Sequence, residues 1–319
     1  MDVQKISIII PLFAASERFF ADLVHFSNLD YSDYEILIVC DRRINVDMKN
    51  AKLILTNQYQ TGPAEKRDIA IKQATGKLCA FIDDDAYPDK NWLREAVKHF
   101  EDPQVGAVAG PGLTPFEDNI FQKAGGAVYE SIFGSGKYRY RFISDKLREV
   151  DDYPAYNLII RKTLLEEIGG FNSTFYGGED TKVCLCIIRA CKKIIYDPNV
   201  IVYHHRRSLF IDHLKQIKNI GIHRGYFVKA FPETSLKLPY FLPSIISIFF
   251  VLGLILSTIF RQIRFFFLLG LLVGFVTVFL STLRKNMIIS FLASFGVIAT
   301  HVTYGFAFIK GIMTKKLTR

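Results

Sequence analysis

Short apolar runs rich in β-branched residues alternate with segments of helical spacing in the N-terminal part of the chain. The runs at 6–12 (ISIIIPL) and 35–40 (EILIVC) have the composition of buried parallel strands, and the segment 16–28 between them has helical apolar spacing. The alternation continues with apolar runs at 52–55, 78–82 and 105–109 and with helical segments at 63–74 and 90–100. This pattern predicts a parallel sheet flanked by helices, an α/β nucleotide-binding fold.

The pattern becomes less regular beyond residue 109. The segment 110–155 is rich in glycine, aromatic and charged residues without clear periodicity. We expect it to hold loops near a ligand, because binding residues concentrate on loops at the carboxyl ends of parallel strands. A strand running into a helix is predicted over 157–170, a helix over about 180–191 and a final strand over 200–204.

The C-terminal part of the chain has a different hydropathy pattern. The segments 239–260, 265–283 and 287–309 contain no Asp, Glu, Lys or Arg, and each approaches or exceeds the roughly 20 apolar residues that cross a ~30 Å hydrocarbon core. We therefore expect a catalytic domain over 1–208 and a transmembrane region over 237–319. Two arrangements fit the pattern: all three helices span, or the first two form a shallow hairpin and only the third crosses.

Between these parts, 209–236 mixes apolar and basic residues and is expected to be an amphipathic segment at the membrane interface. Residues 206–319 hold 15 Lys and Arg against 2 acids, whereas 1–205 hold 25 bases and 29 acids. A basic, apolar tail indicates contact with anionic lipid, and no nucleic-acid partner is expected. The five cysteines form no CxxC pair, and the apolar run near the N-terminus is too short for a secretory signal, so none is expected. We expect a multi-pass protein of the cell membrane whose catalytic domain faces the cytoplasm.

Three successive carboxylates follow the apolar run 78–82, in the sequence FIDDDAYP. Carboxylates at the end of a parallel strand lie in the crevice where α/β sheets bind ligands, and hard oxygen ligands suit Mg²⁺ or Mn²⁺. Such a cation stabilises the negative charge that accumulates on a nucleoside diphosphate leaving group. The alternative is an acidic turn that caps the following helix.

With these motifs, the chain resembles the family-2 glycosyltransferases of the GT-A fold over most of 4–205. The resemblance implies a GT-A nucleotide-diphospho-sugar transferase domain with a Rossmann-like, mostly parallel sheet, followed by C-terminal transmembrane helices. The family's opening strand ends in proline, which matches Pro11. Its base-binding acid matches Asp41, but Cys40 stands where an additional aspartate is common, so the choice of base stays open.

The stretch 61–77 (TGPAEKRDIAIKQATGK) resembles the family's sequence before the metal motif. Gly62, Lys66 and Arg67 are in register, and either cation would screen the diphosphate or simply lie on the helix surface. Asp68 departs from the usual asparagine. The resemblance makes Asp85 the direct metal ligand and Asp83 a ligand of the ribose or the metal, with Asp84 beside them on the donor side.

The segment GGFNSTFYGGED, which ends at residue 180, resembles the family's acceptor-side motif. Its Glu179 and Asp180 are the catalytic candidates, with Asp180 as the general base that accepts the proton of a sugar hydroxyl. A single displacement of this kind inverts the anomeric carbon. The alternative is that both acids only favour the helix N-terminus. The resemblance also makes His204, or else His205, a metal ligand. Further acceptor-side candidates are Gly178, Asn157, Gln216 and Arg224.

Three other functions share parts of this sequence. A polyprenyl-phosphate sugar synthase has the same fold and metal, but its ionised acceptor needs no base, so the Gly-Glu-Asp motif favours a hydroxyl acceptor. A processive polysaccharide synthase is disfavoured because the Gln-x-x-Arg-Trp motif is absent. A catalytically inactive membrane scaffold would be expected to lose at least one of Asp83, Asp85 and Asp180. The predicted protein takes a nucleotide-sugar donor and a glycan or lipid-linked acceptor, as in cell-surface polysaccharide synthesis.

Overall fold

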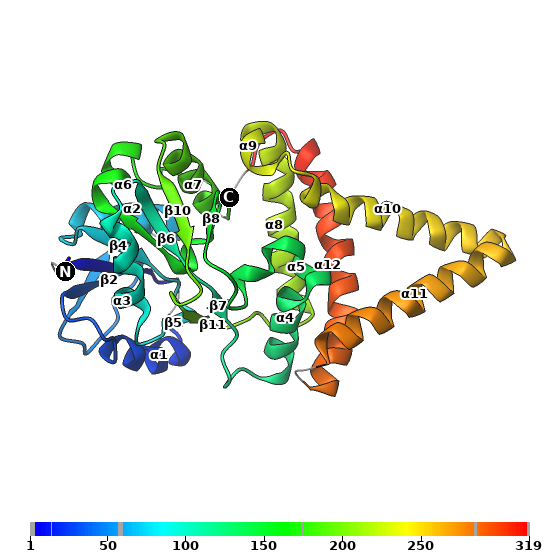
Figure 1. The fold of residues 1–319 in the computed structure, drawn as a ribbon, viewed down its shortest axis with the longest axis horizontal. Coiled ribbons are helices and arrows are strands. Elements are labelled where there is room, and N and C mark those ends of the chain that lie inside the picture. Colours follow the sequence, from blue (N-terminus) through cyan, green and yellow to red (C-terminus); the bar gives the residue numbers. More distant parts are fainter. Residues whose placement is uncertain are drawn as a thin grey trace. The chain divides into compact units, whose positions relative to one another are not determined.

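The computed structural model describes residues 4–13, 15–56, 60–173, 175, 177–283 and 286–317 (Figure 1). The chain divides into two compact units. The first unit contains the residues up to Leu113 together with Ile143–His204, and the second contains Thr114–Phe142 together with the residues from His205 to Leu317. These units differ from the predicted division at residue 208, because 114–142 pack with the C-terminal helices.

The first unit is built on an eight-stranded sheet with the order β3-β2-β1-β4-β9-β6-β10-β8. In chain order its strands are β1 (Ile6–Pro11), β2 (Tyr34–Cys40), β3 (Ala51–Leu55), β4 (Leu78–Phe81), β6 (Val105–Ala109), β8 (Arg148–Val150), β9 (Leu158–Arg161) and β10 (Lys193–Tyr196). β1 pairs in parallel with both β2 and β4, whereas β9 and β8 run antiparallel to their neighbours. The mostly parallel sheet confirms the predicted fold class.

A second, three-stranded sheet contains the strand expected last. Its order is β5-β11-β7, with β5 at Ala86–Pro88, β7 at Gly112–Leu113 and β11 at Val202–His204. The last strand of the main sheet is instead β10, which the pattern did not indicate. In the small sheet, His204 is the antiparallel partner of Ala86, so it lies beside the end of the acidic FIDDD run.

Among the described residues, the first unit contains five α-helices, and the first and second of them begin at residues with clear capping roles. The five helices are α1 (Glu17–Ser27), α2 (Pro63–Gln73), α3 (Trp92–Val97), α6 (Lys162–Ile168) and α7 (Glu179–Arg189), with short 3₁₀ turns η1 (Lys98–Glu101) and η3 (Ala155–Asn157). The Ser16 hydroxyl accepts the N–H of Phe19 at the start of α1. At the start of α2, the Glu65 carboxylate accepts the N–H of Gly62, and Pro63 occupies the first helical position, where no N–H is needed.

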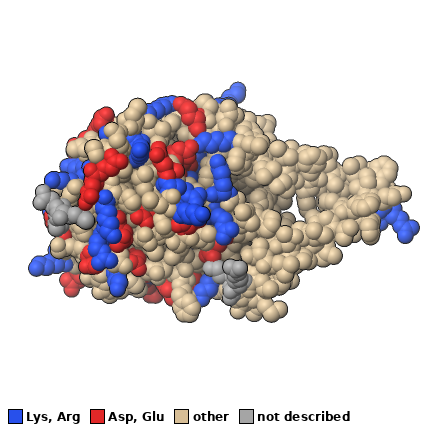
Figure 2. Space-filling view, viewed as in Figure 1, with Lys and Arg blue, Asp and Glu red and all other residues tan. Residues whose placement is uncertain are grey.

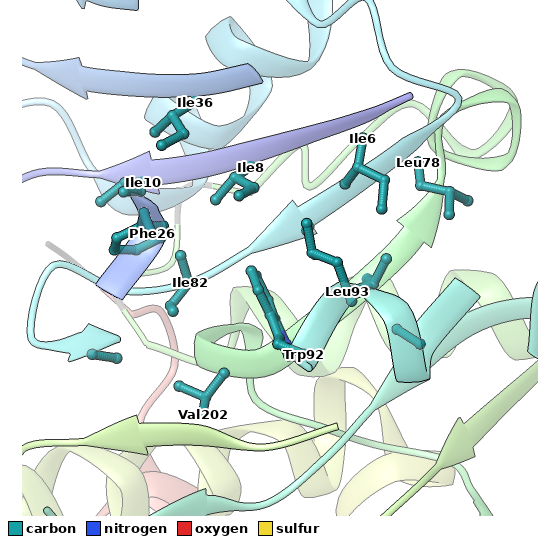
Figure 3. Close-up of a cluster of buried hydrophobic side chains, with 14 of the residues drawn as sticks. Ile6, Ile8, Ile10, Phe26, Ile36, Leu78, Ile82, Trp92, Leu93 and Val202 are labelled. Carbon is teal, nitrogen blue, oxygen red and sulfur yellow. The ribbon is translucent and has the colours of Figure 1, made fainter. Parts of the chain in front are cut away.

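The core of the first unit lies between one face of the sheet and the helices α1 and α3 (Figure 3). Ile8 and Ile10 of β1 point into this layer with Phe26 of α1 and Trp92 of α3, and all four are at most 3% exposed. Burying a side chain of this size contributes about 1.5–3 kcal/mol. The packing fixes the central strands, and therefore the loops that follow their carboxyl ends.

Asn157 is a fully buried polar residue at the centre of this unit. Its Oδ1 accepts the Trp92 indole N–H at 2.8 Å, and its Nδ2 donates to the carbonyls of Gly110 and Val200 at 2.7 and 2.8 Å. Gly110 is required here, because an added Cβ would lie 1.8 Å from the Val200 carbonyl oxygen. Asn157 therefore joins the main sheet to the small sheet.

We expect Asn157→Ala to destabilise the first unit by about 3 kcal/mol, because it leaves buried donors and acceptors unpaired. The melting temperature should fall by roughly 5–10 °C. Trp92 is the only tryptophan in the chain, so its fluorescence follows the unfolding of this unit. The matched control is the exposed Asn28→Ala, which should change stability by less than about 0.5 kcal/mol. Equal melting of the two variants would contradict this role for Asn157.

The second unit is helical throughout its regular elements. It contains α4 (Ile120–Glu130), α5 (Ile132–Ser135), η2 (Gly136–Arg141), α8 (Ile211–Ala230), α9 (Pro232–Ser235), α10 (Leu238–Ile259), α11 (Arg261–Thr282) and α12 (Met287–Met313). The last three are long and apolar enough to cross a membrane. Helix α4 lies inside the stretch expected to hold loops: Asn119 caps it, and Ala124 and Val128 give it one apolar face.

Candidate active site

The site lies at the carboxyl ends of the parallel strands β1, β2 and β4. β1 is hydrogen-bonded to both neighbours in parallel, so the residues after the three strands meet at one edge of the sheet. Leu12 follows β1, Asp41 follows β2, and the run Asp83 to Asp85 follows β4. This edge is where open α/β sheets bind ligands.

Lys66 joins the ends of two of these strands from helix α2. Its ammonium group donates to the Leu12 carbonyl at 2.8 Å and to Asp41 Oδ2 at 3.1 Å, and Lys66 is 1% exposed. Burial by itself would raise the pKa of Asp41, but hydrogen bonds from Thr56 and Lys66 lower it below its ordinary value. Asp41 is therefore held as a carboxylate with a fixed orientation.

Arg67 joins the other two motifs. One guanidinium nitrogen donates to Asp83 Oδ1 at 2.7 Å and another to Glu179 Oε1 at 3.0 Å, which connects β4 to the start of α7. Arg67 is 3% exposed and stacks over the Phe171 ring. Burial lowers the pKa of Arg67, but the carboxylates of Asp83, Glu179 and Asp180 outweigh it and raise the pKa. The burial of both cations excludes the alternative in which they are helix-surface charges.

Asp83, Asp85 and His204 present one ligand atom each within 4.8 Å of one another. His204 Nε2 is 3.0 Å from Asp85 Oδ1, and the Tyr156 ring stacks on the imidazole with centroids 4.7 Å apart. The pKa of Asp83 is raised above its ordinary value, mainly by burial. The positive charge of Arg67 opposes this rise, and the negative charge of Asp85 adds to it. Two carboxylates and an imidazole fit a divalent metal such as Mn²⁺. Asp83 and Asp85 are thus brought together with His204.

The alternative histidine lies in a different environment. His205 Nδ1 is 2.5 Å from Asp118 Oδ1, and both residues are buried in the second unit.

On the donor side, Asp84 Oδ2 accepts the N–H of Phe13 at 2.7 Å, which connects the acidic run to the loop after Pro11.

The acceptor-side motif presents its two acids differently. Gly178 precedes helix α7 with a φ of +86°, a conformation that favours glycine, and directs the chain into the helix. Glu179 is 6% exposed, and both of its oxygens are used, one by Arg67 and one by the N–H of Gly177. Asp180 is half-buried and accepts the N–H of Thr181 at 2.8 Å. Asp180 is therefore better placed than Glu179 to meet a substrate.

Asp68, the departure from the usual asparagine, holds the loop that precedes this motif. Its two oxygens accept the N–H groups of Phe171 and Asn172 at 2.7 and 2.9 Å. Gly170 lies against the same carboxylate with a φ of +72°, and an added Cβ would be 2.4 Å from Asp68 Oδ1. An asparagine has one acceptor oxygen where the aspartate uses two, which gives the departure a physical reason.

The remaining candidates lie elsewhere. Asn157 is inside the core, with its amide fully used by the contacts described above. Gln216 and Arg224 lie on α8 of the second unit, where Gln216 accepts the Tyr129 hydroxyl at 3.1 Å and Arg224 lies over the Tyr240 ring. Sequence reasoning missed Thr56 and Tyr156, since neither belongs to a motif and both approach the site only through the fold.

Comparison with known proteins identifies the family of this chain. The model of glycosyl transferase family 2 matches residues 7–169, a range that holds the donor-side strands, helix α2 and the acidic run. The chain belongs to this family, and its three apolar C-terminal helices fit association with a membrane.

Individual relatives are more distant. The chain is 28% identical over 162 residues to the pre-mycofactocin glycosyltransferase of Mycobacterium tuberculosis, covering 50% of this chain and 33% of that protein. It thus spans about a third of the length of that relative. It is 24% identical over 241 residues to the dolichyl N-acetyl-alpha-D-glucosaminyl phosphate 3-beta-D-2,3-diacetamido-2,3-dideoxy-beta-D-glucuronosyltransferase of Methanococcus voltae, covering 70% of this chain and 74% of that protein.

Among solved structures, the mannosyltransferase PcManGT from Pyrobaculum calidifontis, in complex with GDP-Man and Mn²⁺, aligns with a TM-score of 0.52. The alignment has 19% sequence identity and covers 72% of this chain and 64% of that protein. The likeness shows a shared GT-A fold.

The double ion pair of Arg67 gives a prediction with a defined pH dependence. Arg67→Met leaves Asp83 and Glu179 without their cation, which should cost about 3–5 kcal/mol of stability at neutral pH. The pKa of an unpaired, buried carboxyl is raised above its unfolded value, so the folded state then binds more protons and gains stability as pH falls. The deficit of Arg67→Met should therefore shrink between pH 7.5 and 5.5, as measured by Trp92 fluorescence melting.

Two further variants complete this test. Arg67→Lys should be intermediate, because a single ammonium group cannot reproduce the two-pronged contact of a guanidinium. Arg94→Met removes the exposed pair with Asp30 and should cost less than about 1 kcal/mol. A deficit for Arg67→Met that does not vary with pH would show that lost packing on Phe171, and not charge, explains it.

Proposed function

We propose that this glycosyltransferase moves a sugar from a nucleotide-sugar donor to a hydroxyl of a glycan or lipid-linked acceptor at the membrane, with inversion at the anomeric carbon. The observation that carries the proposal is the contact of Arg67 with both Asp83 and Glu179. It places the acidic run of the donor side and the Gly-Glu-Asp start of α7 around one buried cation, as a transfer between two substrates requires.

On the donor side, we assign Asp41 to the nucleoside base, with its orientation fixed by Thr56 and Lys66. Asp83 and Asp84 face the ribose and the diphosphate. Lys66 and Arg67 act as positioning residues, because each is buried and already paired with a carboxylate. Their role is to hold Asp41 and Asp83 in the charged, oriented form that the donor meets.

The metal site is proposed on the same residues. Asp85, Asp83 and His204 would hold Mg²⁺ or Mn²⁺, and the imidazole in this set favours Mn²⁺ over Mg²⁺. When bound, the cation supplies stabilisation of the negative charge on the leaving diphosphate. The structural neighbour with GDP-Man and Mn²⁺ supports this choice for a protein of the same fold.

Asp180 is the proposed general base. Its carboxylate accepts the proton of the acceptor hydroxyl while that oxygen forms a bond to the anomeric carbon and the bond from this carbon to the diphosphate oxygen breaks. The electron pair of the broken bond stays on the diphosphate. Glu179 is the positioning residue, because its contacts with Arg67 and Gly177 fix the first turn of α7. With Glu179 committed in this way, one displacement with inversion is the simplest route.

Two observations bear on the acceptor and on the side of the membrane. The Methanococcus voltae relative is named for a dolichyl-linked sugar phosphate, which supports a lipid-linked acceptor for this chain. The five cysteines are all free, and Cys191 is exposed, as suits a reducing compartment. We therefore propose that the catalytic unit faces the cytoplasm. A polyprenyl-phosphate acceptor is the second candidate, and it would need no base at Asp180.

The proposal is tested by release of nucleoside diphosphate from UDP-, GDP- and dTDP-sugars in membranes that carry the protein, with Mn²⁺ or EDTA and a lipid extract as the source of acceptor. One donor should be turned over, and EDTA should abolish turnover. Asp180→Asn should lower the rate at least about 100-fold while leaving Mn²⁺ binding, measured by electron paramagnetic resonance, unchanged. Asp85→Asn should lose both the turnover of the donor and the binding of Mn²⁺.

The matched control is Asp33→Asn, an exposed aspartate just before β2, at the sheet edge opposite the site. It should leave rate and Mn²⁺ binding unchanged. Full activity of Asp180→Asn would overturn the base and favour a phosphate acceptor. Failure to bind any donor, with Mn²⁺ bound normally, would overturn the enzymatic proposal and favour a binding scaffold.

A further inference from the structure

Helix α12 is covered along much of its length by two other helices of the second unit. On α8, His213 Nε2 is 2.8 Å from Thr300 Oγ1, and Gly225 packs so closely that an added Cβ would lie 2.1 Å from the Phe308 carbonyl oxygen. On α4, Val128 forms one buried cluster with Ala293 of α12 and its neighbours. Helices α4 and α8 therefore cover much of α12, and α10 packs on it as well, with the Ser247 hydroxyl donating to the His301 carbonyl at 3.1 Å.

The position of α4 in the chain fixes its side of a membrane. The segment Thr114–Phe142 leaves the first unit after Leu113 and returns to it at Ile143. Helix α4 has 11 residues, about 17 Å, too short to cross a hydrocarbon core of ~30 Å. The segment therefore stays on the side of the first unit. It contacts the middle of α12, since His301 Nε2 is 2.5 Å from the Phe133 carbonyl oxygen.

Helix α8 carries charges that do not fit the interior of a bilayer. Asp212, Lys215, Lys218 and Lys229 are all exposed. If α12 crossed the membrane with α8 packed along it, these side chains would enter the hydrocarbon region, where charged groups are strongly unfavourable. At a membrane surface the same basic residues meet anionic headgroups.

Helices α10 and α11 have the opposite character. They contain no acidic residue, and their basic residues, Arg261 and Arg264, lie in the first turn of α11, next to the bend between the helices. Figure 2 shows an uncharged projection with Lys or Arg only at its tip. Each helix has 22 residues, about 33 Å, which is enough to cross the core. In the most apolar stretch of each helix, only 17% of α10 and 6% of α11 is buried, against 33% of α12.

Where α12 is exposed, it shows a single apolar stripe. The large exposed apolar residues of α12 are Met287, Ile288, Phe291, Phe295, Phe306 and Met313, and all of them except Met287 recur at helical spacing. Phe291 and Phe295 contact Phe275 of α11, with ring centroids 5.8 and 5.0 Å apart. The stripe therefore faces the same side as the hairpin. Other helices cover the remaining faces of α12, so this stripe is the part of α12 that is left to contact lipid.

We propose that, among the described residues, the α10–α11 hairpin alone crosses the bilayer, with Arg261 and Arg264 among the headgroups of the far side. Helix α12 lies at the near surface with its apolar stripe against lipid. The first unit and the end of α12 are then on the same side. This differs from both arrangements expected from the hydropathy pattern, since each of those has the third helix crossing.

The test is the labelling of single cysteines with a membrane-impermeant maleimide in sealed vesicles of known orientation. The native Cys191 is exposed on the first unit and reports its side when Cys186 is changed to serine. In a Cys186→Ser/Cys191→Ser background, we introduce Gln262→Cys at the tip, Lys218→Cys on α8 and Lys316→Cys after α12, all at exposed positions. The matched control is Leu272→Cys, exposed in the middle of α11.

Lys218→Cys and Lys316→Cys should label from the side of Cys191, Gln262→Cys from the opposite side only, and Leu272→Cys from neither. Labelling of Lys316→Cys from the opposite side would overturn the proposal in favour of a third crossing. Labelling of Gln262→Cys from the side of Cys191 would show that the hairpin does not cross, and labelling of Leu272→Cys would show that it lies outside lipid. Sugar transfer measured in the same vesicles is independent of these outcomes, so the function can stand where the topology falls.

Discussion

The buried guanidinium of Arg67 is the contact on which the geometry of the site depends. It joins Asp83 at the end of β4 to Glu179 at the start of α7, two residues far apart in the sequence. A buried cation between two carboxylates is stable only when all three are held in good geometry. The strands, the turn before α7 and helix α2 must therefore all be in place before the ion pairs form. The geometry of the site therefore depends on the correct packing of the whole sheet against helix α2.

The sequence was informative where chemistry is local. The acidic run after β4 and the Gly-Glu-Asp start of α7 are contiguous motifs, and the alternation of strands and helices predicted the sheet that presents them. The sequence did not indicate which side chains would be buried against other parts of the fold. Nothing in the pattern of α2 distinguishes a buried Lys66 from a surface one, because its charged and apolar residues are interleaved, and the strands that cover it come from elsewhere. Tyr156 and Thr56 were missed for the same reason.

The stretch 110–155 shows a different limit. Its glycines and aromatics suggest loops, yet α4 forms there because Asn119 caps it and the faces of Gly125 and Gly126 allow close packing against other segments. The segment shows no clear periodicity by itself, because the apolar face of α4 is completed by α12, more than 150 residues away. Hydropathy alone likewise marks all three helices as able to cross a membrane, whereas the helices packed against them distinguish α12 from α10 and α11.

The charges of the site also explain why the proposed reaction needs a cation from outside the chain. Lys66 is paired with Asp41, and Arg67 is paired with both Asp83 and Glu179. The positive charge of each is therefore already neutralised by carboxylates and does not offset the charge of a diphosphate. Asp85 and Asp180 add further negative charge at the same edge of the sheet. A nucleoside diphosphate would meet repulsion there unless a divalent ion bridged it to the carboxylates. In the proposed function, Asp83 and Asp85, which would repel the donor without a metal, are the carboxylates that would hold the ion.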